Sequence, residues 1–399
     1  MPDHKSSAPT TFFFLMLPQG ISQGFVTVTL PFVLTKAGVS VATTAVIVAI
    51  GLSANVWRFL WGPIVDLTLS LRRWYIIGLV AAVVSLMLLG LMPPQPGALF
   101  TSLVFTSQVA ATFTLIPLGG MMAHTVSDGE KGRASGWYQA GGFSGWGIGG
   151  GAGVWLAAHY SGEVAALLLA AAMLLAVGAL RLIPDVRAVS NERVASRLRD
   201  IGKDFAIMLR SPSALFVVAM VLTPIGLGAA SSLWSSVAGD WGASPDRVAL
   251  VTGLLSGMFS AVGCVAGGSI CDRLGRWWAF FGAGAVIAAV AVAMAAAPRT
   301  PEFYSYSVLT YAFGMGAGNA AYSALVLHAS GRGAASTKYA ILASLGNVPN
   351  VYMTAFDGWT HDRWSAAGML YAEALVSVLC IAIGLAALWK INRAFASVG

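Results

Sequence analysis

The chain has 399 residues, of which 57% are apolar and only 10% are charged. An average soluble domain has roughly 25% charged residues, so this composition excludes an ordinary soluble globular protein and indicates a chain dissolved in lipid. The formal net charge of +7 comes from 23 basic and 16 acidic residues, and their distribution indicates membrane topology rather than binding to nucleic acid.

Twelve apolar segments follow one another along the chain. Each contains about 20 mostly apolar residues or more, enough for a helix to cross a hydrocarbon core of about 30 Å. They predict an all-α integral membrane protein with twelve transmembrane helices. The first six segments are 11–36, 41–66, 74–92, 98–124, 134–158 and 163–184, and the second six are 213–238, 246–270, 277–297, 303–327, 336–359 and 366–389.

The basic residues predict the orientation of the chain. Short cytoplasmic loops keep Lys and Arg, whereas translocated loops lose them. Eighteen basic residues fall on the side of both termini, and only Lys36, Arg247, Arg299 and Arg363 fall on the other side. We therefore expect both termini in the cytoplasm. The remaining basic residue, Arg58, lies inside the second segment.

Polar residues in the first two segments predict part of a polar pathway. Gln19 and Gln23 are four residues apart, which places both on one face of the first helix. Asn55 lies near Arg58 in the second segment. For any single amide, the alternative is a hydrogen bond that holds two membrane helices together.

Arg58 lies eight residues before Asp66, so it is about 12 Å along the helix from the cytoplasmic end. An unpaired charge near the bilayer centre costs at least about 2.5–3.5 kcal/mol on insertion scales. Arg58 therefore needs a partner. Two interpretations stay open: a cavity arginine that binds an anionic substrate group or takes part in proton coupling, and a permanent ion pair that braces the cytoplasmic gate.

Acidic and basic residues at two repeated positions predict this gate. A carboxylate at a helix end can lie against the positive N-terminus of a neighbouring helix, and arginines beside it can pair with acids. We expect Asp66 and Asp272 to approach the helix starts near Ser336 and Ser135 when the cytoplasmic side is closed. The alternative is that these are ordinary interfacial charges. The predicted gating residues are Asp66, Arg72, Arg73, Asp272, Arg273 and Arg276.

The chain is organised as two halves. Gly-Pro-Ile-Val-Asp at 62–66 has its counterpart about 200 residues later, in Gly-Ser-Ile-Cys-Asp at 268–272. Internal repeats of this kind are how many secondary transporters are built. We expect an N-terminal six-helix bundle at 1–184, a cytoplasmic amphipathic linker at 185–212, and a C-terminal six-helix bundle at 213–399. The many glycines of the fifth segment predict close approach between helix backbones.

Further polar residues lie in the tenth and eleventh segments, and together with those above they complete a predicted substrate cavity. Their clustering on the first, second, tenth and eleventh segments favours a polar pathway. The predicted cavity residues are Arg58, Gln19, Gln23, Asn55, Tyr311, Asn319, Tyr322, Asn347 and Asn350.

Two acids inside the last segments are candidates for proton coupling, because a low-dielectric site favours the protonated form of a carboxyl group. Asp357 lies near the outer end of the eleventh segment, where the alternative is a simply solvated side chain. Glu373 lies about nine residues into what we take as the twelfth helix, where the alternative is a structural or interface residue.

Motifs for other functions are missing from the sequence. An intramembrane hydrolase or acyltransferase needs a nucleophile, a base and an orienting group, and neither G-x-S-x-G nor H-E-x-x-H occurs. A nucleotide-driven pump needs G-x-x-x-x-G-K-[ST], which does not occur either. The three cysteines predict neither a disulfide framework nor a metal site. We expect no enzyme activity and no cofactor, while a receptor that never transports stays open.

Several stretches resemble a known family. The second copy of the repeat, GGSICDRLGR at 267–276, resembles the loop signature of the major facilitator superfamily. WRFLWGPIVD at 57–66 resembles the K-F-L-W-A-P-L-V-D stretch of its AmpG-like branch, with Arg58 in place of lysine and Gly62 in place of alanine. The segments 17–40, 129–153 and 336–347 resemble that branch too, so the resemblance runs through both halves.

The resemblance implies a function. The AmpG-like branch includes muropeptide permeases, acetyl-CoA transporters and siderophore importers of the RhtX/FptX type, and this chain lacks the two extra spans of some muropeptide permeases. It implies a monomeric transporter of the bacterial inner membrane that takes up a siderophore or a similar small polar or peptidic solute with protons by alternating access. The alternatives are a muropeptide permease and a multidrug efflux pump. It also implies that the twelfth span is peripheral.

Overall fold

The computed structural model describes residues 8–126, 131–185, 212–330 and 341–396, together with 196, 199, 202, 203 and 206. Within these ranges the regular structure is entirely helical. Eight stretches are long and apolar enough to cross a membrane, and the last of them, Ile341–Lys390, is long enough for two crossings. The predicted fold class is therefore confirmed. The predicted linker, 185–212, lies almost wholly outside the described residues.

The first half makes six passages. Serine side chains cap several of its helices: Ser40, Ser70 and Ser161 each accept a hydrogen bond from the backbone N–H three residues later, which satisfies a group that the helix leaves free. The passages are α1 (Thr11–Gly24) with the π-helical η1 (Phe25–Thr29) and α2 (Leu30–Lys36), α3 (Val41–Leu67), α4 (Leu71–Leu91), α5 (Ala98–Thr125), α6 (Lys131–Gly147) with the π-helical η3 (Ile148–Ala152) and α7 (Gly153–His159), and α8 (Gly162–Leu180).

The second half makes six more. Trp364 and Ser365 leave helical backbone geometry and divide α17 into the last two passages. The elements are α10 (Pro212–Val221), the short η4 (Ala229–Ser232), α11 (Trp234–Val237) and η5 (Ala238–Trp241), then α12 (Pro245–Val248) with the π-helical η6 (Ala249–Leu255) and α13 (Ser256–Leu274), α14 (Arg276–Ala296), α15 (Pro301–Ser330) and α17 (Val348–Ala396).

The seventh passage differs from its prediction. The sequence predicted one continuous helix over 213–238, but the helix ends at Val221 and regular structure resumes only at Ala229. Pro224 lies in the gap, and Gly226 and Gly228 have φ angles of 74° and 68°. Proline cannot donate a backbone hydrogen bond, and glycine adopts positive φ at little cost, so this stretch unwinds the helix.

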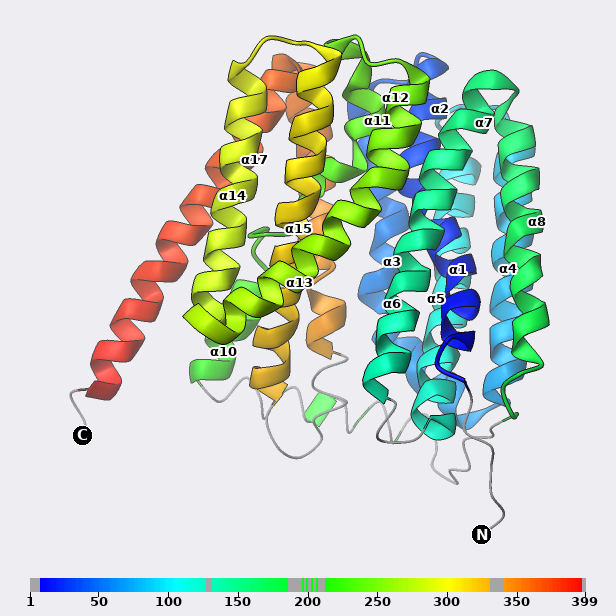
Figure 1. Cartoon of the computed structure of the whole chain (residues 1–399), viewed down its shortest axis with the longest axis horizontal. Helices are drawn as coiled ribbons and strands as arrows, with labels where there is room; N and C mark the ends of the chain where they lie inside the picture. The colour runs from blue at the N-terminus through cyan, green and yellow to red at the C-terminus, as the bar shows by residue number, and fades with distance from the viewer. Residues whose placement is uncertain are drawn as a thin grey trace.

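The start of α1 and the end of α17 lie on the same face of the molecule, which we call the terminal face (Figure 1). We call the opposite face the distal face; it carries the loops 37–40, 242–244 and 297–300. α7 and α12 contact each other near the distal face, and α6 and α13 separate from there toward the terminal face. The two halves therefore meet closely at the distal end.

Glycines bring helix backbones into direct contact, as the sequence predicted for the fifth segment. A Cβ atom at Gly141, Gly145 or Gly149 would lie only 2.1–2.4 Å from carbonyl oxygens of α1, so a larger residue would separate the two helices. Between the halves, a Cβ atom at Gly253 of η6 would lie 2.2 Å from the Cα of Gly151 in η3. The fifth and eighth passages thus cross at two glycines.

A buried apolar cluster also joins the halves. Val28, Val41 and Val154 of the first half pack in the same cluster as Leu233 and Trp234 of the second. The hydroxyl group of Ser235 donates a 2.7 Å hydrogen bond to the carbonyl oxygen of Val28. These contacts hold the broken seventh passage against the first passage.

Candidate functional site

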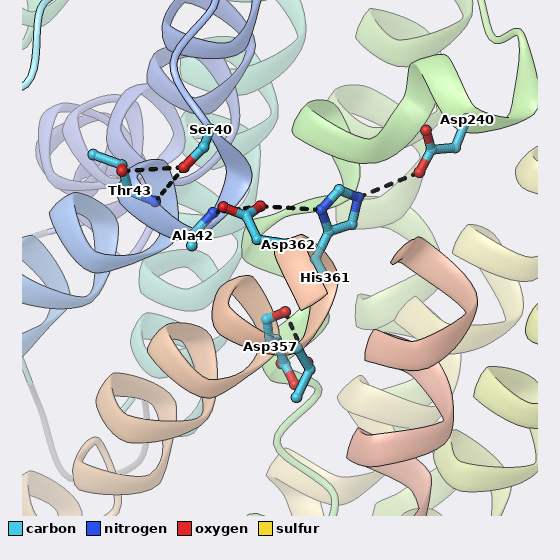
Figure 2. A network of polar contacts seen from close by, with 8 residues as sticks. Ser40, Ala42, Thr43, Asp240, Asp357, His361 and Asp362 are labelled. Atoms are coloured by element: carbon cyan, nitrogen blue, oxygen red, sulfur yellow. Dashed lines mark hydrogen bonds and ion pairs between the residues drawn. The ribbon is translucent and has the colours of Figure 1, made fainter. Parts of the chain in front are cut away.

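A polar latch closes the distal face. The carboxylate of Asp362 in α17 accepts a 3.1 Å hydrogen bond from the backbone N–H of Ala42, in the first turn of α3, which Ser40 caps through Thr43. Figure 2 shows this contact between the halves. A carboxylate at a helix N-terminus satisfies a free N–H group and complements the helix dipole. One side chain of the second half therefore completes a helix cap of the first.

His361 extends the latch across the second half. Its Nδ1 lies 3.4 Å from a carboxylate oxygen of Asp362, and its Nε2 lies 3.3 Å from a carboxylate oxygen of Asp240 in η5 (Figure 2). A separate pair, His159 and Asp246, joins the ends of α7 and α12 at 3.5 Å. The polar contacts of the distal face thus bind α3, η5 and α17 into one unit.

A cluster of two carboxyl groups and one phenol lies inside the second half. The hydroxyl of Tyr311 donates a 2.5 Å hydrogen bond to Oε1 of Glu373, and the N–H of Ala230 donates a 3.3 Å bond to the same oxygen. Glu373 is 3% exposed, and Asp357 and Tyr311 are fully buried. Oε2 of Glu373 and both carboxylate oxygens of Asp357 have no hydrogen-bond partner among the described residues.

The break in the seventh passage positions this cluster. Because the helix unwinds before Ala229, the N–H groups at the start of η4 have no partner one turn earlier, and that of Ala230 points to Glu373. A Cβ atom at Gly228 would lie 2.7 Å from the ring of Tyr311. The glycine therefore provides both the left-handed backbone and the space for the phenol.

Two of the alternatives and one of the predictions for these residues need correction. Asp357 is not solvated, because α17 packs against α3 and α14 and leaves its side chain fully buried. Glu373 is not on a peripheral surface, since η4 and α15 cover its carboxyl group. Tyr311 was expected to line a substrate cavity, but it is fully buried and its hydroxyl is bound to Glu373. The three residues belong together as a buried cluster.

The polar residues of the first half have a different environment. Gln19 and Gln23 are half-buried and bond to each other, with 2.9 Å between Nε2 of Gln19 and Oε1 of Gln23. Asn55 is 8% exposed, and Arg58 is half-buried. The ion pairs of the described residues involve His159, Arg247 and His361, and none involves Arg58. No described carboxylate thus holds the guanidinium in place.

Two of the predicted cavity residues of the second half are bonded within that half. Tyr322 donates a 2.7 Å hydrogen bond to the carbonyl oxygen of Leu342, and Nδ2 of Asn347 donates a 2.9 Å bond to that of Ala343. Asn319 and Asn350 are half-buried. The bond of Tyr322 joins two neighbouring passages, which is the structural role that the sequence left open.

The predicted gate lies mostly beyond what the structure describes. The side chains of Asp66, Asp272 and Ser135, and the whole of Ser336, are outside the described residues, so the gate stays a prediction. Arg72 donates hydrogen bonds of 2.8 and 2.7 Å to the carbonyl oxygens of Leu180 and Ile183 at the end of α8, a contact within its own half. Arg73 and Arg273 are exposed, and Arg276 lines a cavity of about 530 Å³.

Sequence reasoning did not single out the distal latch. Asp240, His361 and Asp362 are polar residues at the ends of apolar segments, where charged residues are expected in any membrane protein. The sequence did contain a signal for the break in the seventh passage. The run from Thr223 to Gly228 places a proline and two glycines in an apolar segment, which is typical of a broken helix. That break is what brings Ala230 to Glu373.

Several solved structures are similar to this chain. A POT family transporter in complex with a thioalcohol-conjugated peptide has 12% identity and a TM-score of 0.71, with 96% of each chain covered. The nucleoside transporter NupG has 11% identity and a TM-score of 0.74, with 95% of this chain and 98% of that chain covered. A bacterial homologue of the human drug peptide transporters PepT1 and PepT2 has 12% identity and a TM-score of 0.69, with 96% and 98% covered. At these identities the likeness establishes the fold alone.

The family follows from the sequence itself. No curated protein matches the chain. Residues 12–354 match the Major Facilitator Superfamily, and this range runs from α1 through the tenth passage into the first part of α17. Together with the helical fold and the apolar spans, it shows that the chain belongs to the Major Facilitator Superfamily and is a membrane transporter of that type.

Proposed function

We propose that this transporter takes up a small polar solute together with protons across the inner membrane of a bacterium. The observation that carries the proposal is the buried cluster, in which three carboxylate oxygens of Asp357 and Glu373 have no described partner. Transport driven by a proton gradient needs a group that gains and loses a proton inside the protein. A buried carboxyl group without a fixed counter-ion meets that need.

The orientation gives the proposal its direction. By the predicted topology, eighteen basic residues fall on the side of the termini and four on the other side, so we take the terminal face to be the cytoplasmic one. The latch and the glycine crossing then close the outer side. Alternating access requires these contacts to break when the substrate enters and to form again before its release. We take the working unit to be one chain, with an N-terminal bundle at 1–184, the linker at 185–212 and a C-terminal bundle at 213–399.

The substrate class follows from Arg58. A half-buried guanidinium without a described counter-ion binds a carboxylate, hydroxamate or phosphate group through charge-assisted hydrogen bonds. Asn55 lies three residues earlier on the same helix, and Gln19 and Gln23 offer amides on α1. Together with the resemblance to the AmpG-like branch, this favours a ferric siderophore. The predicted cytoplasmic gate of Asp66, Arg72, Arg73, Asp272, Arg273 and Arg276 remains part of the proposal.

A peptidic solute is the second candidate. The POT family transporter of similar fold was solved with a conjugated peptide, and a second one with 5-aminolevulinic acid, both small solutes with polar ends. An anhydro-muropeptide combines a sugar with a peptide. Efflux of a cationic drug is the third candidate. Arg58, which has no counter-ion among the described residues, disfavours it because like charges repel.

Reconstitution of the purified protein in liposomes tests the proposal. A ferric siderophore, an anhydro-muropeptide and acetyl-CoA are offered separately, with an inwardly directed proton gradient or without it. We expect accumulation of the siderophore that stops when a protonophore dissipates the gradient. Accumulation that persists with the protonophore present would contradict proton coupling, and export of a cationic dye with uptake of none of the three solutes would make the protein a multidrug pump.

A further inference from the structure

We propose that Asp357, Tyr311 and Glu373 form one proton-binding site, in which the two carboxyl groups share a single proton and Tyr311 fixes which oxygen can hold it. The inference rests on the proposed proton coupling and goes further, because it assigns the proton to a three-residue site in the second half. The geometry described for the buried cluster supports it in four steps.

The first step is the cost of two buried charges. An unpaired carboxylate in a low-dielectric interior is strongly unfavourable, and a second carboxylate nearby raises the cost further. Asp357 and Glu373 are both buried and interact electrostatically, and among the described residues Tyr311 interacts with both of them. No described cation faces them. At least one of the two carboxyl groups must therefore carry a proton.

The second step is where that proton lies. Oε1 of Glu373 already accepts hydrogen bonds from Tyr311 and from the N–H of Ala230, so it is the oxygen best suited to hold negative charge. The oxygens left for a proton are Oε2 of Glu373 and the two oxygens of Asp357. The donors therefore favour a carboxylate on Glu373 and a carboxylic acid on Asp357, with exchange between them.

The third step distinguishes a proton from a metal cation. A sodium or calcium ion needs several oxygen ligands directed toward it. Here two hydrogen-bond donors point at the same carboxylate oxygen, and a donor hydrogen repels a cation. Within the described surroundings, the arrangement suits a shared proton better than a bound metal ion.

The fourth step connects the site to the distal latch. Asp357 is four residues before His361 and five before Asp362 on one continuous helix, so it lies about one turn, roughly 5.4 Å, from the latch. Figure 2 shows Asp357 directly below His361. When the latch opens, this part of α17 moves. Asp357 then becomes accessible from the outer solution while the charge of its carboxyl group changes.

Infrared spectroscopy on the purified full-length protein tests the site without any substrate. We expect a carbonyl band of a protonated buried carboxyl group at neutral pH, and we expect Asp357→Asn to remove it. Glu163→Gln, at an exposed acid of α8, is the matched control and should leave the band unchanged. The same band in both Asp357→Asn and Glu373→Gln would overturn the site, and so would a band that disappears when sodium is added.

Transport on the same preparations separates this inference from the proposed function. We expect Glu373→Gln to retain exchange of siderophore across the membrane, because exchange needs no net proton movement, but to lose accumulation driven by a proton gradient. Tyr311→Phe keeps both carboxyl groups and is the second variant in case Glu373→Gln does not fold. Its accumulation of siderophore should fall several-fold. Full accumulation by both variants would contradict the proton-binding site. A wild-type protein that never responds to a proton gradient would contradict the proposed function. The infrared result would still test the site in that case.

Discussion

In the first half of the molecule, the predicted cavity residues are three amides and one arginine: Gln19 and Gln23 are half-buried and bonded to each other, Arg58 is half-buried, and Asn55 is 8% exposed. In the second half the corresponding interior holds two acids and a phenol that are almost wholly buried. The two halves share a six-helix plan and still differ in the sign of the charge they place inside the membrane.

This difference suggests a division of work between the halves. A half-buried arginine can reach a solute in an aqueous cavity, whereas a buried acid can exchange only something as small as a proton. We therefore assign solute binding to the first half and proton binding to the second. The broken seventh passage makes the second half different, since it supplies the N–H group that holds Glu373.

The largest expected effect is that of Glu373→Gln on gradient-driven transport. The amide keeps the size of the side chain but cannot exchange a proton with Asp357, so accumulation should fall to the level seen with a protonophore. The melting temperature should stay within a few degrees of wild type, because the amide oxygen can still accept the hydrogen bonds from Tyr311 and from the N–H of Ala230. Uptake and melting temperature are measured on one preparation. Undiminished accumulation would contradict the assignment of proton binding to the second half.

The next effect concerns Arg58. Loss of a charge-assisted contact is worth about 1.5–3 kcal/mol, so Arg58→Ala should weaken siderophore binding by roughly 10- to 100-fold. Arg58→Lys keeps the charge and should retain part of the affinity. Titration calorimetry measures both. If Arg58 instead braced a gate through a fixed pair, its removal would leave a buried carboxylate and lower stability by about 3–5 kcal/mol with binding retained.

A smaller effect is expected at Gly228. Alanine there would hold a strained positive φ and press against the ring of Tyr311, at a cost of about 1–3 kcal/mol in the free energy of unfolding. The melting temperature of Gly228→Ala should fall by several degrees. Gly282→Ala, where nothing lies within 4 Å of the new Cβ atom, is the control and should melt no lower than wild type.

The smallest effect is that of the distal latch. Asp362→Asn weakens the cap that the second half places on α3, which is worth about 0.5–2 kcal/mol, and the outer side should open several-fold more often. Distances between spin labels at positions 163 and 302, one in each half, report this opening in a cysteine-free background. Asp185→Asn, at an exposed acid, is the control and should leave the distances unchanged. Unchanged distances in Asp362→Asn would show that the latch has no role.

Much of the fold is predictable from the sequence, because length and apolar content fix the spans and glycine content fixes where helices touch. Asp357 and Glu373 are also recognisable as unusual acids in apolar segments. Their burial is not recognisable, since Glu373 meets Ala230 across 143 residues of chain and Asp357 is covered by packing from the other half. A residue such as Asp362 gains its role only when α3 comes to lie beside it.

The central claim is that the first half binds the solute and the second half binds the proton. One paired measurement tests this claim most directly. Siderophore affinity and gradient-driven accumulation are measured for Arg58→Ala and Glu373→Gln in the same liposomes. We predict that Arg58→Ala loses both, whereas Glu373→Gln loses accumulation and keeps an affinity within about twofold of wild type, a change below 0.5 kcal/mol. Equal loss of affinity in the two variants would contradict the division between the halves.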